Sequence, residues 1–208
     1  AYGNKFTGAS YKVYTLDGTS ELESKKIKKA GKNFSLDLSG DKVLDEERIL
    51  EVRLNRNGAD PVYFYTRIVS DEDANVAQCL NYISDYHENA LAKAENAGVG
   101  AALEPTDDAD NTTLQHVTIN SNYEQVTWGS LKPQVEQEER WSIKELNSTC
   151  MSVLLQYRVS CKGEENESDR YAVKEFFRVR YIADAQKTYL LDYDRTMDQI
   201  FDATKKVL

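Results

Sequence analysis

Apolar and polar residues alternate along much of this chain, a pattern that predicts antiparallel strands. Within residues 48–56, Leu50, Val52 and Leu54 alternate with Glu51 and Arg53, which is typical of a strand with one buried face. The Asn57-Gly58 pair that follows favours a tight turn, and residues 62–69 return as a second strand. Pro61 lies at the start of that strand, where its missing N–H does least harm. We therefore expect a hairpin here.

Three further segments precede this hairpin. Residues 11–16 alternate and end at an Asp17-Gly18 turn signal, so we expect a strand. Ser20 and Glu23 have the spacing of a capping box, which predicts a short helix ending near Ala30. Residues 34–38 alternate again and predict a half-buried strand.

One apolar stripe with helical spacing follows the hairpin. Its positions are Val76, Leu80, Ile83, His87, Ala90 and Ala94. Such spacing predicts an amphipathic helix, which we place over residues 71–97, with acidic residues in its first turn.

The second half of the chain is richer in strand patterns. We expect a hairpin from residues 116–119 and 123–128, and strands at 141–146, 150–161, 171–182 and 188–193. The 150–161 segment alternates most regularly, so we expect it to be central. Apolar positions near the end of the chain predict a helix over residues 195–207.

These elements predict an α+β fold: antiparallel sheet(s) with one long amphipathic helix (about 71–97) and a C-terminal helix (about 195–207). The small and acidic residues of 101–113 predict a loop or linker. The domains expected are then 1–100, a hairpin with the long helix, and 114–208, an antiparallel meander with the C-terminal helix. A single domain is the alternative.

The net charge argues against nucleic-acid binding, and the hydropathy argues against a membrane-spanning segment. The 208 residues have a formal net charge of −9, and such a field repels phosphate backbones, so we expect no nucleic-acid binding. No run of eighteen apolar residues occurs, so we expect no membrane span.

Motifs for metals, nucleotides and covalent catalysis fail on spacing. His87-Glu88 begins like H-E-x-x-H, but Leu91 stands where the second histidine belongs. Gly98 and Gly100 follow a predicted helix, whereas a dinucleotide-binding loop follows a strand. The acidic residues of 107–111 lack the spacing of a calcium loop. We expect no cofactor, metal or nucleotide.

The three cysteines form no C-x-x-C pair. An odd number leaves one thiol over in any pairing, and we expect all three to be buried and unreactive. These are Cys79, Cys150 and Cys161.

Seven residues are candidates for contact with a ligand or partner. Tyr63 and Tyr65 lie in a predicted strand and offer large rigid rings. His87 lies on the helix stripe, as a core histidine or as a base. Alternation in the 171–182 strand puts a basic strip with one aromatic on a single face. That strip consists of Lys174, Phe176, Arg178 and Arg180.

These observations favour a non-catalytic binding or interaction domain of a secreted or membrane-anchored bacterial protein. Its partner would be a protein or a cell-envelope polymer. The chain starts at Ala1 without methionine, which suggests either a processed chain, with a signal peptide or an anchor removed upstream, or a trimmed one. The first reading favours an extracytoplasmic location. Two alternatives stay open. One is a hydrolase using carboxylates or a Cys/His pair; the other is a structural subunit of a homo-oligomer, joined through the long helix.

Overall fold

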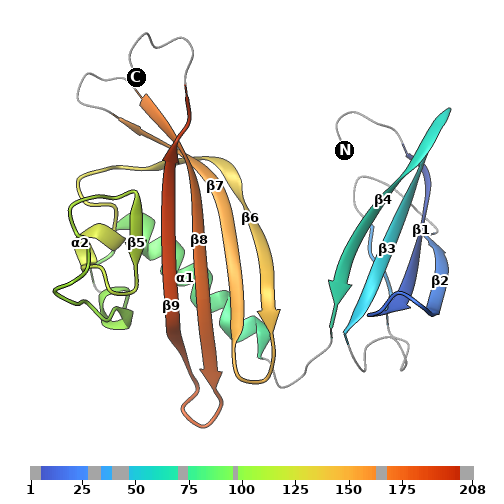
Figure 1. The fold of residues 1–208 in the computed structure, drawn as a ribbon, viewed down its shortest axis with the longest axis horizontal. Coiled ribbons are helices and arrows are strands. Elements are labelled where there is room, and N and C mark those ends of the chain that lie inside the picture. Colours follow the sequence, from blue (N-terminus) through green and yellow to red (C-terminus); the bar gives the residue numbers. More distant parts are fainter. Residues whose placement is uncertain are drawn as a thin grey trace. The chain divides into compact units, whose positions relative to one another are not determined.

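The computed structural model describes residues 6–27, 34–38, 47–69, 75–95, 98–162 and 168–201. The chain divides into two compact units, residues 1–71 and 72–208. Each unit contains one antiparallel sheet, so the α+β class with antiparallel sheets is confirmed (Figure 1).

The first unit is a four-stranded sheet with the order β2-β1-β3-β4. Its strands are β1 (Phe6–Thr15), β2 (Glu21–Ile27), β3 (Arg48–Arg56) and β4 (Ala59–Ile68). The predicted hairpin is confirmed as β3 and β4, which pair from Arg48–Ile68 to Leu54–Val62 without a register shift. Gly58 has a φ of 68°, a conformation that favours glycine in the tight turn between them.

One face of this sheet carries a small apolar core. Tyr11 and Val13 of β1 lie opposite Val52 and Leu50 of β3, and all four are buried. Residues 34–38 do not form the predicted strand. They cover this face instead, since Phe34, Leu36 and Leu38 pack against the four core residues.

The helix predicted from Ser20 is wrong over residues 21–27, which form strand β2; residues 28–30 lie outside the described part of the chain. The capping-box spacing is overridden by pairing with β1 across the Asp17-Gly18 turn. Side chains reinforce that pairing, because Lys12 and Glu21 form an ion pair at 2.7 Å and the Tyr11 hydroxyl donates to Glu23.

The second unit is a five-stranded sheet with the order β5-β9-β8-β7-β6. Its helices are α1 (Val76–Ala92), η2 (Gly100–Ala102) and α2 (Tyr123–Val126). Its strands are β5 (His116–Thr118), β6 (Gln134–Leu146), β7 (Met151–Lys162), β8 (Ser168–Ile182) and β9 (Lys187–Gln199). The strand predicted at 150–161 is present as β7 and is internal, between β6 and β8, but the central position of the sheet belongs to β8.

Helix α1 lies across one face of this second sheet (Figure 1). Its buried residues are Cys79, Ile83, Tyr86, His87 and Ala90. The Tyr86 ring contacts the rings of Phe177 on β8 and Tyr193 on β9, with centroids 5.7 and 5.4 Å apart. The helix predicted at 71–97 is therefore present over residues 76–92, and residues 71–74 lie outside the described part.

The division between the units falls at residues 71/72, not within 101–113. The apolar face of α1 matches the second sheet, so the helix belongs with 114–208 and not with the first hairpin. Residues 101–113 also pack on this unit, because Glu104 N–H and Thr106 N–H donate to the carbonyls of Ile119 and Asn120.

Two predictions near the second sheet are corrected. The segment 123–128 is not a strand, since residues 123–126 form α2, capped by the Asn122 side chain, which accepts from Gln125 N–H at 2.9 Å. The C-terminal helix expected from residue 195 is a strand up to Gln199, and residues 202–208 lie outside the described part. Burial in β9 alternates, and a buried arginine, Arg195, interrupts the apolar series that would have revealed the strand.

The described helices include none long and apolar enough to cross a membrane. All three cysteines are buried and unpaired in the structure, as predicted.

The separate cores predict separate unfolding. We expect Leu50→Ala, in the first core, and Met151→Ala, in the second, each to lower the free energy of unfolding of its own unit by about 2–5 kcal/mol. Differential scanning calorimetry of the full chain checks this. Each variant should shift one transition, and a shift of both by either variant would contradict two independent cores.

Candidate functional site

Two sheets present four edges, and three of these edges carry features that discourage pairing with another chain. Strand β5 has only three residues. Strand β2 is short and charged, with the sequence ELESKKI. Strand β6 has three shifts in its register with β7, which interrupt a regular row of backbone groups. Short length, charge and bulges are the usual protections of sheet edges.

Strand β4 carries none of these protections over its central part. Its pairing with β3 is regular across 62–68, and residues 62–66 (VYFYT) contain no charge. The side chains of Val62, Tyr63, Phe64 and Tyr65 are 40, 45, 58 and 57% exposed. The open edge, which we define as residues 62–66 of β4, is therefore regularly paired, uncharged and accessible.

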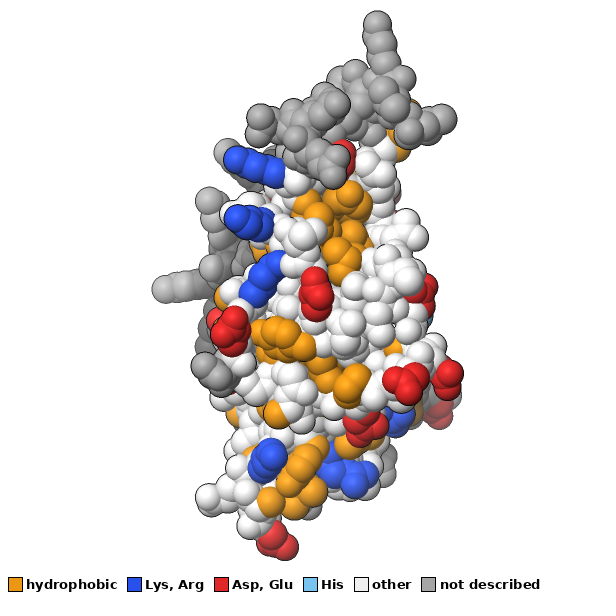
Figure 2. Space-filling model, turned by 90° about the vertical axis from the view of Figure 1, so that its left-hand side faces the viewer, with side chains coloured by type: hydrophobic (Ala, Val, Ile, Leu, Met, Phe, Trp, Pro, Cys, Tyr) orange, Lys and Arg blue, Asp and Glu red, His pale blue; other side chains and the backbone are white. Residues whose placement is uncertain are grey.

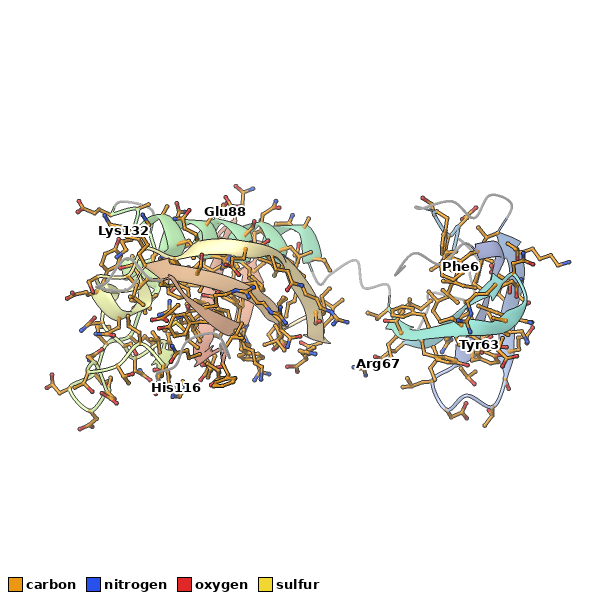
Figure 3. All side chains as sticks on the ribbon, turned by 90° about the horizontal axis from the view of Figure 1, so that it is seen from above. Phe6, Tyr63, Arg67, Glu88, His116 and Lys132 are labelled. Atoms are coloured by element: carbon orange, nitrogen blue, oxygen red, sulfur yellow. The ribbon has the colours of Figure 1, made fainter. Side chains whose placement is uncertain are left out.

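Tyr63 and Tyr65 lie on the face of the first sheet that points away from its core. Their rings are stacked, with centroids 6.3 Å apart and planes 13° apart. The Tyr65 hydroxyl donates to Glu51 at 2.9 Å, and this bond raises the pKa of Tyr65. The Arg53 guanidinium lies 5.9 Å from the Tyr63 centroid. Neighbours on β3 thus hold both rings in place, and Tyr63 and Arg67 can be followed along β4 in Figure 3.

Phe64 lies on the other face of the same strand. It is paired with Val52, a member of the first core. Its side chain nevertheless remains 58% exposed. The open edge therefore has apolar side chains on both faces.

His87 is sealed between α1 and the second sheet. Its Nδ1 lies 2.5 Å from Oε2 of Glu175 on β8, and the Tyr193 hydroxyl donates to Oε1 of the same carboxylate at 2.7 Å. The side chains of His87 and Glu175 are 4% and 1% exposed. The His87 ring also contacts the Tyr157 ring edge-on, with centroids 5.0 Å apart.

The charges in this cluster are matched. Burial lowers the pKa of His87, but the hydrogen bond and charge of Glu175 outweigh burial and raise it overall. Burial raises the pKa of Glu175, but His87, Arg195 and Tyr193 lower it overall. The carboxylate of Glu139 lies 3.7 Å from His87 Nε2, so it adds charge without a hydrogen bond. Both shifts favour the charged forms, an imidazolium beside a carboxylate.

Arg195 completes the cluster from β9, directly opposite Glu175. Its two terminal nitrogens donate to the carbonyls of Val126 and Gln125 at 2.7 and 2.9 Å. Its guanidinium lies 4.0 Å from the Trp128 ring centroid, a cation–π contact. This buried arginine ties α2 to the sheet.

The cluster shows the properties of a structural ion pair. An acid–base catalyst must reach its substrate, whereas His87 and Glu175 are closed off. Two hollows on the second unit, of about 450 and 300 Å³, include none of these residues. The smaller hollow is lined by His116 and by Asp110, and His116 Nε2 lies 2.6 Å from Asp194 Oδ2.

The described residues contain no group of three or more His, Cys, Asp or Glu that could hold a metal ion.

Figure 2 shows the side of the second unit that carries α2 and β5, where hydrophobic side chains lie in small groups among charged ones.

The predicted basic strip lies on the face of β8 that points away from α1, as the alternation predicts. Both of its arginines have hydrogen-bond partners. Arg178 donates to Glu145 at 3.0 Å, and it lies opposite Asp192 of the neighbouring strand β9 in the sheet register. Arg180 donates to the Thr149 carbonyl at 2.7 Å. Phe176 of the strip is paired with Asp194. A contact role for Lys174 and these neighbours stays a prediction.

The structure thus brings Tyr63 and Tyr65 together, while His87 and the basic strip lie on opposite faces of another sheet. Sequence reasoning missed Phe64, Glu175 and Arg195. Phe64 could have been found from the uncharged run VYFYT. The partners of Glu175 and Arg195 come from elements distant in the sequence, so no local sequence pattern predicts these buried charges.

No family model, curated protein or solved structure matches this chain.

Removing the charge of Glu175 should destabilise the second unit. We expect Glu175→Gln to lower its free energy of unfolding by about 3–5 kcal/mol, because a buried imidazolium loses its counterion. Urea titration followed by circular dichroism measures this. The matched control is Glu136→Gln, which removes an exposed ion pair to Arg170 and should cost less than about 1 kcal/mol. Equal losses in both variants would refute the assignment.

The same pair predicts how stability depends on pH. His87 has a pKa raised above its ordinary 6.5, so its contribution is complete below pH 6.5 and is lost as pH rises through the raised value. Glu175 has a pKa lowered from 4.5, so its contribution is complete above pH 4.5 and is lost as pH falls through the lowered value. We expect the second unit to be most stable between pH 4.5 and pH 6.5, where both contributions are complete. Urea titrations at pH 5.5 and 8 should show a loss of stability at pH 8 that His87→Gln diminishes; an undiminished loss would assign it to other groups.

Proposed function

We propose that this protein is a non-catalytic interaction module that binds an extended polypeptide strand along the open edge of β4. One observation carries the proposal. Of the four sheet edges described, β4 alone combines regular pairing, an uncharged centre and exposed large side chains.

The backbone of an edge strand determines the class of partner. Its outward N–H and C=O groups recur along the strand, and another strand is the ligand that matches them along their whole length. A cell-envelope polymer could use the tyrosine rings but not this row of groups. Extended polypeptide is therefore favoured over the polymer.

The side chains add affinity to the backbone contacts. Tyr63 and Tyr65 are held by stacking, by Glu51 and by Arg53, so little rotamer entropy remains to be lost on binding. Large, rigid aromatic side chains are the typical anchors of interfaces. Phe64 supplies a further anchor on the other face.

The proposal can be tested with a displayed library of ten-residue peptides selected against the full chain. We expect selected peptides to slow hydrogen exchange of backbone amides in residues 62–67. Phe64→Lys should weaken their binding at least about tenfold, because a lysine on an edge strand discourages pairing.

The matched control is Ile143→Lys, which changes an exposed aliphatic residue on the β6 edge and should leave peptide binding unchanged. If protection falls outside β4, or if Phe64→Lys binds as well as the unchanged chain, the proposal fails.

A further inference from the structure

We infer that the strand that pairs with β4 is β4 of a second copy of this chain. The two strands would be antiparallel, related by a two-fold axis through the Phe64 position. This inference rests on the proposed function, since it names the partner of the same edge.

Symmetry restricts the possible pairings. A two-fold axis perpendicular to a continuous sheet keeps each side chain on its own face, so one residue must lie opposite its own copy. With the axis at Phe64, residues equally distant from it in sequence oppose each other. Tyr63 then lies opposite Tyr65 of the other copy, and Val62 lies opposite its Thr66.

Both faces of β4 are complementary to themselves in this register. On the face away from the core, the stacked Tyr63 and Tyr65 of one copy meet the same pair of the other. On the core face, two Phe64 rings meet and extend the apolar surface begun by Val52. Aromatic pairs opposite each other are among the favourable cross-strand contacts.

Charges and backbone geometry also fit this axis. The charged residues of β4 lie toward its two ends, Asp60 near one and Arg67 near the other. Antiparallel pairing brings the acidic end of one strand beside the basic end of the other, and no like charges oppose each other within residues 60–68. Pro61, which has no N–H, falls opposite Arg67 near the end of the pairing. An axis at Tyr63 would instead put Pro61 opposite Tyr65.

Self-contact through α1, the alternative raised by its apolar stripe, is less favoured. Ile83 of that stripe is completely buried within its own unit. Val76 and Leu80 pack against the same core. The long helix is therefore used inside the unit.

A single pair of strands is a small contact, so the dimer should be weak and should depend on concentration. Covalent trapping is the suitable assay. Residues directly opposite in an antiparallel pair have Cα atoms about 4.5–5.5 Å apart, within the range of about 4.4–6.8 Å that a disulfide spans. Phe64→Cys should therefore link two copies under mild oxidation.

The matched control is Thr66→Cys, on the same face of the same strand. In the proposed register its two copies lie about 13 Å apart, since each residue advances a strand by about 3.3 Å. The three native thiols are buried and give the background from the unchanged chain. We expect Phe64→Cys to yield at least about fivefold more linked dimer than Thr66→Cys, given these distances. Equal yields would overturn the register.

Sedimentation equilibrium of the full chain supplies a measurement without cysteine. Phe64→Lys puts two lysines opposite each other and should raise the dimer dissociation constant at least about tenfold. Ile143→Lys should leave it unchanged. A chain that stays monomeric up to millimolar concentration, with no linking of Phe64→Cys, overturns this inference. The proposed function still stands in that case if selected peptides protect β4, and it falls as well if they do not.

Discussion

The second unit is organised around one requirement, the neutralisation of a carboxylate inside an apolar sheet face. Glu175 is closed off from solvent, and an unpaired charge there would be too costly to keep. Its partners come from two other elements: His87 from α1, and Tyr193 and Arg195 from β9. The contact between His87 and Glu175 therefore favours the observed position of α1 on the sheet. Arg195 also holds α2 against the sheet, because it donates to two backbone carbonyls of that helix.

The first unit follows a different principle. Its buried core is small, consisting of four residues on two central strands and the side chains that residues 34–38 lay over them. Ile68 of β4 packs against this core, whereas Val62, Tyr63, Phe64 and Tyr65 of the same strand are at least 40% exposed. The central part of β4 is thus accessible for contact while its backbone stays paired with β3.

The sequence predicts those parts of the fold whose side-chain period is unbroken. The β3–β4 hairpin, strand β7 and helix α1 each have a regular apolar series and end at turn signals. The predictions failed where contacts between residues distant in the sequence outweighed a local sequence pattern. The Ser20–Glu23 spacing resembles a helix start, yet pairing with β1 makes the segment a strand. The end of β9 reads as a helix because Arg195 occupies a buried position where an apolar residue is expected. Of the candidate site, Tyr63 and Tyr65 follow from the sequence, but the contrast among the four edges requires the complete topology.

The cysteines have a consequence for how this fold responds to oxidants and reductants. Burial raises the pKa of Cys79 and Cys161, which keeps them as neutral thiols with little nucleophilic character. Cys150 is also buried and unpaired. No crosslink stabilises the chain, and neither oxidants nor reductants find an accessible sulfur in it. The folded chain therefore has no disulfide for a reductant to break and no exposed pair of thiols for an oxidant to join.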